Sequence, residues 1–110
     1  GDFDTTGWNI LTLNIKQMYF NLILRGEKTI EYRDLKPSTM NRFTWVDTST
    51  GSRYLKKFDA LRLCVGRTAG SDCMLVEVVD TTYDSDAQRV EYHLGKVVQV
   101  DVSRNPTERT

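Results

Sequence analysis

The residues best suited to chemistry lie within one short segment, GEKTIEYR, at positions 26–33. Lys28 and Arg33 supply cationic hydrogen-bond donors, and Glu31 supplies an acceptor. A nucleobase edge presents donors and acceptors together, so a carboxylate beside two cations suits a base with its phosphate or ribose, whereas phosphate alone would not require Glu31. Taken without context, Glu31 and Arg33 are more typical of a surface ion pair that contributes less than about 1 kcal/mol.

Other familiar sites have little support in the sequence. His93 is the single histidine, and Cys64 and Cys73 lack the spacing of a metal-binding pair, so we expect no metal site and no cofactor. The segment GRTAG lacks the Lys-Ser/Thr that completes a phosphate-binding loop, and there is no nucleophile elbow for a serine hydrolase. We expect both cysteines to be reduced and mostly buried, as in a protein of a reducing compartment.

The distribution of charge indicates an anionic ligand of limited size. Hydrophobic residues make up 39% and charged residues 27%, which is ordinary for a globular protein, and the net charge is zero. Eleven Lys and Arg against five acidic residues give positions 16–67 a charge of +6, while residues 1–15 carry −2 and residues 68–110 carry −4. Such a basic middle fits a local anion better than a long duplex, although charges scattered over a solvated surface are the alternative.

The segment before this cluster has the pattern of a helix that follows a short strand. Residues 10–13 are apolar and short enough for a buried strand. Asn14 and Gln17 have the spacing of a capping box, and Arg25 and Gly26 suit the end of a helix. The helical face is formed by Ile15, Met18, Tyr19, Leu22 and Ile23, and it is widened to near-complete burial by Phe20 and Leu24.

After the helix, residues 28–33 alternate as in a strand, with Ile30 and Tyr32 on one side and Thr29, Glu31 and Arg33 on the other. Residues 34–57 are rich in Ser, Thr, Asn, Pro and charge, which predicts a long excursion. We expect Phe43 and Trp45 to anchor it, with a short strand near positions 42–46.

The remaining segments predict strands. Residues 58–65 and 73–82 are separated by turn-forming residues and should pair as a hairpin, while residues 88–102 alternate with Gly95 as a bulge. The fold class is therefore α+β, a small mixed β-barrel of five to six strands with one or two flanking helices. We expect an N-terminal extension at 1–9, one domain at 10–102 and a disordered tail at 103–110.

Residues 11–37, LTLNIKQMYFNLILRGEKTIEYRDLKP, resemble the start of an ASCH domain, whose signature is Gly-x-Lys-x-x-Glu-x-Arg after a first helix. The chain matches it at Gly26, Lys28, Glu31 and Arg33, and FDALRLCVG and YHLGKVV resemble later segments of the family. The resemblance implies a PUA-like barrel whose cleft binds RNA or nucleotides. Some ASCH proteins are amidohydrolases that deacetylate N4-acetylcytidine with a Lys and a hydroxyl three positions later, and here Glu31 stands at the hydroxyl position.

Three functions remain open from the sequence. In the first, the domain binds RNA or a modified nucleotide through Lys28, Glu31, Arg33 and Lys16, with Tyr32 or Trp45 stacking on the base. In the second, a metal-independent hydrolase uses Lys28 as base and Glu31 to activate water on a nucleoside amide or RNA. In the third, the loop at 34–57 binds protein. The absence of an apolar run of roughly 20 residues and of a signal peptide predicts no membrane association and a cytoplasmic location.

Overall fold

The computed structural model of the protein describes residues 4–102. Five strands form one mixed sheet in the order β1-β5-β6-β7-β2, and two further strands form a separate hairpin, β3-β4. Two short helices accompany them. The elements are β1 (Ile10–Asn14), α1 (Gln17–Leu24), β2 (Ile30–Asp34), α2 (Met40–Phe43), β3 (Thr44–Val46), β4 (Arg53–Leu55), β5 (Ala60–Cys64), β6 (Cys73–Asp84) and β7 (Arg89–Asp101).

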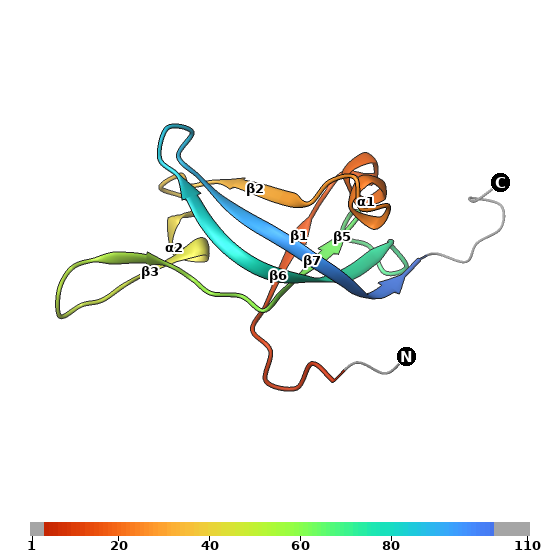
Figure 1. Cartoon of the computed structure of the whole chain (residues 1–110), viewed down its shortest axis with the longest axis horizontal. Helices are drawn as coiled ribbons and strands as arrows, with labels where there is room; N and C mark the ends of the chain where they lie inside the picture. Colours follow the sequence, from red (N-terminus) through yellow and green to blue (C-terminus); the bar gives the residue numbers. More distant parts are fainter. Residues whose placement is uncertain (1–3, 103–110) are drawn as a thin grey trace.

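The main sheet curls into half a barrel, with β1 and β2 at its two edges (Figure 1). β1 pairs in parallel with β5, and all other pairs in this sheet are antiparallel. The long strands β6 and β7 carry the curvature, because their register shifts at three places between Leu75 and Asp80. The α+β fold class and the mixed, barrel-like sheet expected from the sequence are therefore confirmed.

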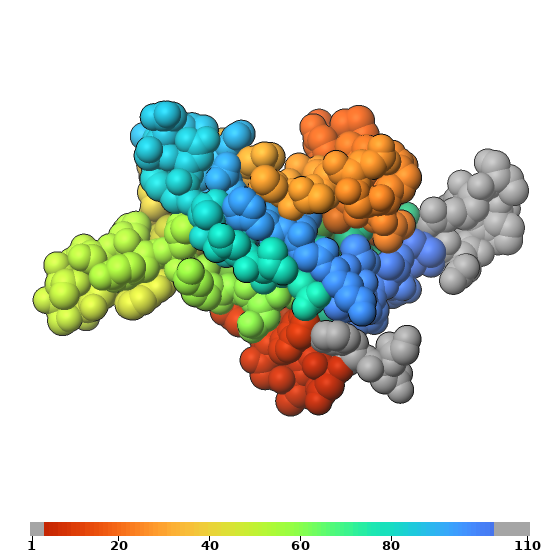
Figure 2. Space-filling view, viewed as in Figure 1, coloured from red at the N-terminus to blue at the C-terminus, as the bar shows by residue number. Residues whose placement is uncertain are grey.

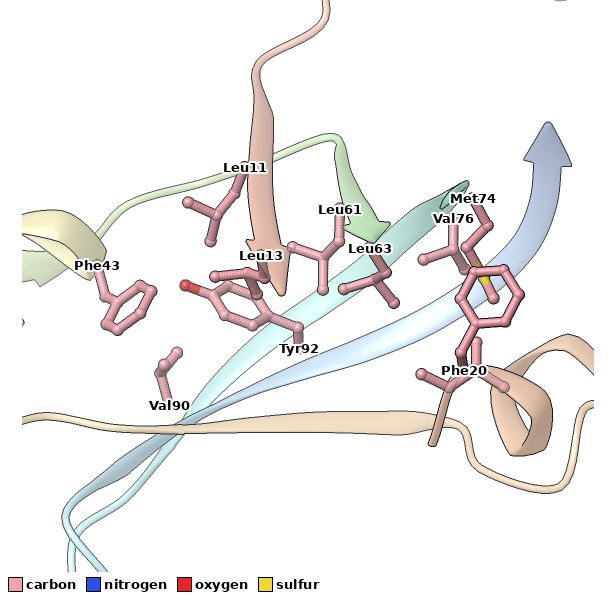
Figure 3. Packing of buried hydrophobic residues seen from close by; sticks show 11 residues of the cluster. Leu11, Leu13, Phe20, Phe43, Leu61, Leu63, Met74, Val76, Val90 and Tyr92 are labelled. Atoms are coloured by element: carbon pink, nitrogen blue, oxygen red, sulfur yellow. The ribbon is translucent and has the colours of Figure 1, made fainter. Parts of the chain in front are cut away.

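The core lies in the concave side of this half-barrel (Figure 3). Alternation along β1 turns Leu11 and Leu13 inward, opposite buried side chains of β5. Tyr92 of β7 is fully buried, and its ring meets those of Phe43 and Phe58 edge to face at 6.4 and 6.2 Å. Its hydroxyl has no hydrogen-bond partner in the described part of the chain.

Three local predictions are confirmed. Residues 58–65 and 73–82 pair as the expected hairpin, with Ala60 opposite Glu77. Gly26 has φ +77°, the left-handed conformation that ends α1 without the steric cost of a Cβ. Gly95 lies at a break in the β6–β7 register, where an added Cβ would come within 2.6 Å of Val79 Cγ1.

The predicted start and burial of the first helix are wrong. Asn14 is the last residue of β1 and pairs with Cys64, so it cannot cap a helix that begins at Gln17. The side-chain amide of Gln17 instead donates from Nε2 to Asn21 Oδ1 at 3.0 Å. Only Phe20 and Ile23 are buried in α1, whereas the exposed large side chains are Met18, Tyr19 and Leu24. An eight-residue helix makes only about two turns, so the stripe that faces the core holds just these two side chains.

The expectation of two reduced cysteines is also wrong, because Cys64 and Cys73 form a disulfide. The two residues are the last of β5 and the first of β6, and the antiparallel register places them directly opposite each other. Directly opposed positions in an antiparallel pair have the separation that a disulfide needs. The cellular location stays a prediction.

The segment at 34–57 is more ordered than a loop. It contains α2 and the β3–β4 hairpin, with β3 at Thr44–Val46 inside the range expected for a short strand. Phe43 is buried as the expected anchor, but Trp45 is 49% exposed and anchors nothing in the core. The expected tail at 103–110 lies outside the described residues, as do the first three residues of the expected extension.

Candidate nucleotide-binding cleft

A cleft of about 550 Å³ opens between the two edges of the half-barrel. One wall is the end of β1 with the first turn of α1, and the other is β2 with the turn that precedes it. The lining residues are Asn14, Ile15, Lys16, Tyr19, Lys28, Glu31, Tyr32, Arg33 and Asp34. The structure thus brings all four predicted ligand-binding residues, Lys16, Lys28, Glu31 and Arg33, to one cleft.

Glu31 is the centre of an ionic cluster in this cleft. Its side chain is 8% exposed, since alternation along β2 turns Glu31 and Arg33 to the inner side of the strand. Arg33 donates from Nε and Nη2 to Glu31 Oε2 at 3.0 and 2.6 Å. Lys28 Nζ lies 3.7 Å from Glu31 Oε1. The pair is therefore far less exposed than the surface ion pair considered from the sequence.

Arginine side chains bridge the gap that the sheet leaves open. Arg33 Nη2 also donates to the carbonyl of Asn14 at 2.9 Å, across the cleft on β1. Arg42 of α2 donates in the same way to the carbonyl of Thr12 at 2.5 Å. Both carbonyls belong to the edge of the sheet, where an unpaired acceptor needs a partner. The two guanidinium groups thus donate to carbonyls that would bond to a neighbouring strand in a closed barrel.

The turn after α1 fixes the position of Lys28. The backbone amides of Glu27 and Lys28 both donate to the carbonyl of Leu22, at 2.9 and 3.1 Å, as the chain reverses through Gly26. Lys28 Nζ then donates to the carbonyl of Ile30 at 2.7 Å. These contacts hold the ammonium group at the entrance of β2, beside Glu31.

Two tyrosines form the aromatic part of the cleft. Lys28 Nζ lies 5.4 Å from the ring centroid of Tyr19 and 5.0 Å from that of Tyr32. The guanidinium of Arg89 also lies over Tyr32, at 4.0 Å from its ring. Tyr32, predicted as a stacking residue, is therefore contacted by two cations. Among residues 4–102, Lys28 is the one cation that lies over the ring of Tyr19.

The sequence prediction missed several lining residues. Tyr19 was assigned to the buried helix face, and Asn14 to a helix cap. No local signal marks Asn14, because its role depends on the separation of β1 and β2. Trp45, the other predicted stacking residue, lies on the β3–β4 hairpin and does not line the cleft.

The electrostatic balance of the cleft favours an anion. Lys16, Lys28 and Arg33 face two carboxylates, Glu31 and Asp34, and Arg33 leaves Nη1 without a hydrogen bond to residues 4–102. Burial raises the pKa of the Tyr92 phenol nearby, and the positive charge of Arg33 opposes that rise. The geometry thus offers cationic donors around a fixed acceptor, an arrangement that is complementary to a base with an attached phosphate.

Among residues 4–102, no group of three or more His, Cys, Asp or Glu side chains could hold a metal ion. Within the same part of the chain, no helix is long and apolar enough to cross a membrane. In comparisons with known proteins, no family model, no curated protein and no solved structure matches this chain.

Proposed function

We propose that the cleft binds a nucleotide, free or as part of RNA, and that the domain is a binding module of the ASCH type. The observation that supports this most strongly is the geometry of Glu31, a nearly buried carboxylate that Arg33 and Lys28 hold between them. An acceptor fixed in this way suits the exocyclic amine of a base. A ligand that consisted of phosphate alone would be repelled by it.

The cations around Glu31 have donors to spare for the rest of such a ligand. Lys28 Nζ carries three donors, and one of them is used on the carbonyl of Ile30. Lys16 is exposed at the rim and forms no ion pair in the described part of the chain. Phosphate or ribose oxygens placed between Lys16 and Lys28 would meet cationic donors while the base reaches Glu31. Tyr19 offers a ring at the same rim.

Binding and turnover of cytidine 5′-monophosphate, N4-acetylcytidine and short RNAs test this proposal. Lys28→Ala removes one charge-assisted contact, which is typically worth about 1.5–3 kcal/mol, so we expect nucleotide affinity to fall roughly 10–100-fold. Lys96→Ala is the matched control, because Lys96 is exposed on β7 and outside the cleft. Circular dichroism verifies that both variants are folded.

The outcomes separate the candidate functions. Saturable binding without product supports the binding module, whereas turnover of N4-acetylcytidine that disappears in Lys28→Ala would show that the domain is a hydrolase. Equal affinities in wild type, Lys28→Ala and Arg33→Lys would rule out the cleft as the binding site. Arg33→Lys is informative because lysine keeps the charge but lacks the planar guanidinium that donates from both Nε and Nη2 to Glu31 Oε2.

A further inference from the structure

A second surface with the properties of a ligand site lies on the β3–β4 hairpin, which projects from the half-barrel (Figures 1 and 2). Trp45 and Tyr54 are directly paired across the two strands, and their ring centroids lie 5.2 Å apart with an interplanar angle of 32°. The two residues are 49% and 48% exposed. The hairpin therefore presents two adjacent aromatic rings to solvent, away from the core.

The hairpin and the residues that flank it in the sequence are strongly basic. Four cations lie on or beside the hairpin: Arg42, Arg53, Lys56 and Lys57. Within residues 4–102, none of the four forms a salt bridge, in contrast to Arg25, Lys28, Arg33 and Arg89. The single acidic residue of the segment 40–57 is Asp47. Its carboxylate accepts hydrogen bonds from the backbone and hydroxyl of Ser49. The uncompensated positive charge of these Lys and Arg side chains complements a polyanion.

A groove of about 360 Å³ lies between Tyr54 of this pair and the body of the protein. Its walls are mainly apolar and include Met40, Tyr54 and Tyr83. Arg53 lies at the same groove, and its Nη1 donates to Thr44 Oγ1 at 2.8 Å. An apolar slot with one oriented guanidinium can hold a planar base and contact the phosphate next to it.

We propose that this hairpin, with its groove, is a second subsite that binds an unpaired stretch of single-stranded nucleic acid, so that the natural ligand is a polymer. The inference rests on the proposed function of the cleft and extends it. Trp45 and Tyr54 stack on successive bases, while Arg53, Lys56 and Lys57 contact the backbone. Arg42 of α2, which directly precedes the hairpin, donates to the carbonyl of Thr12 on β1, the strand whose end forms one wall of the cleft. Aromatic rings among unpaired cations favour nucleic acid over an acidic peptide, because a peptide carboxylate gains nothing from stacking.

Fluorescence titration tests the proposal directly, since the chain has two tryptophans. In a Trp8→Phe background Trp45 is the sole reporter, and we expect oligouridine of about ten nucleotides to quench it while a mononucleotide does not. Trp45→Ala and Tyr54→Ala, followed by fluorescence anisotropy of labelled oligouridine, should each weaken oligomer binding about tenfold and leave mononucleotide affinity unchanged. Both side chains are half-exposed and lie outside the core, so we expect the variants to fold.

Charge substitutions give an independent readout. Lys56→Ala and Lys57→Ala should each reduce the slope of log affinity against log salt by about 0.7, the value for one phosphate contact to a single strand. Lys96→Ala, outside the hairpin, should leave the slope unchanged. Oligodeoxyuridine and polyglutamate serve as competitors, and displacement by polyglutamate as effective as that by oligouridine would overturn the proposal.

Different outcomes would contradict the hairpin proposal and the cleft proposal. If oligouridine binds as tightly to Trp45→Ala and Tyr54→Ala as to wild type, the hairpin is not a subsite, whatever the cleft binds. If mononucleotides fail to bind while oligouridine binding still depends on Trp45, the hairpin proposal stands and the cleft proposal falls. If neither ligand binds to the wild-type protein, both are wrong.

Discussion

Replacing Glu31 with alanine should destabilise the protein far more than the same change four residues earlier. Glu31→Ala leaves Lys28 and Arg33 beside each other without the carboxylate that both contact. Removing one partner of a buried ion pair typically costs about 3–5 kcal/mol. Here the side chains of Lys28 and Arg33 are 18% and 26% exposed and can turn partly to water, so we expect a loss of about 2–3 kcal/mol.

Glu27→Ala provides the matched control. Glu27 also pairs with an arginine two positions away, Arg25, but these two side chains are 58% and 57% exposed. Exposed pairs contribute little, so the control should lose less than about 0.5 kcal/mol. Glu31→Gln keeps one acceptor for Arg33 and should fall between the two alanine variants.

Urea unfolding followed by far-ultraviolet circular dichroism measures these differences as shifts in midpoint at constant slope. Burial is the property that distinguishes these two otherwise similar Glu–Arg pairs, and it is the expected cause of the difference in stability. Equal losses in Glu31→Ala and Glu27→Ala would refute it, because Glu31 would then behave as a surface residue. A changed slope in Glu31→Ala alone would indicate that the edges of the half-barrel had separated.

Three further predictions concern the framework. Tyr92→Phe removes a buried hydroxyl that has no partner in residues 4–102, so urea unfolding should show equal stability or a gain of up to about 1 kcal/mol. Because burial raises the pKa of Tyr92 above 10.0, the folded state keeps its proton when the unfolded state has lost it, so stability should fall above that pH, and less steeply in Tyr92→Phe. Gly95→Ala should cost about 1 kcal/mol through the clash with Val79, and Val79→Ala should restore it in the double variant. Reduction of the Cys64–Cys73 disulfide should lower the free energy of unfolding by about 2–3 kcal/mol by the chain-entropy estimate, whereas a thiol assay that finds two free thiols in the folded, air-oxidised protein would contradict this disulfide.

Local patterns located most strands and the first helix, but they did not show which faces of these elements are buried. Alternation placed Glu31 and Arg33 on one side of their strand, and the structure has them hydrogen-bonded to each other. That this polar side turns inward could not be predicted, because it depends on the gap between β1 and β2. The helical stripe likewise located α1, yet Tyr19 and Leu24 are exposed, which the stripe alone could not indicate.

The predictions of two reduced cysteines and of Trp45 as an anchor were wrong for different reasons. The predicted hairpin brought Cys64 and Cys73 near the adjoining ends of its two strands, but its register was not predicted and a disulfide was set aside on an assumed compartment. For Trp45 the sequence held no signal. An aromatic residue in a polar segment fits an anchor and an exposed platform equally well, and only the projection of β3–β4 from the sheet decides between them.

The cleft exists because β1 and β2 do not pair with each other and the barrel is therefore not closed. A backbone ladder between β1 and β2 would use the carbonyl of Asn14 and fill the space that the cleft occupies. The guanidinium of Arg33 donates a hydrogen bond to that carbonyl and also to Glu31. The carbonyl at the edge of β1 therefore has a partner, while the space between β1 and β2 stays open. Folding and the proposed ligand binding would therefore share Arg33, whereas Lys28 contacts Glu31 and the carbonyl of Ile30 but not β1. It follows that Lys28→Ala should separate the two, with weakened binding in a folded protein, and that Arg33→Ala should weaken both together.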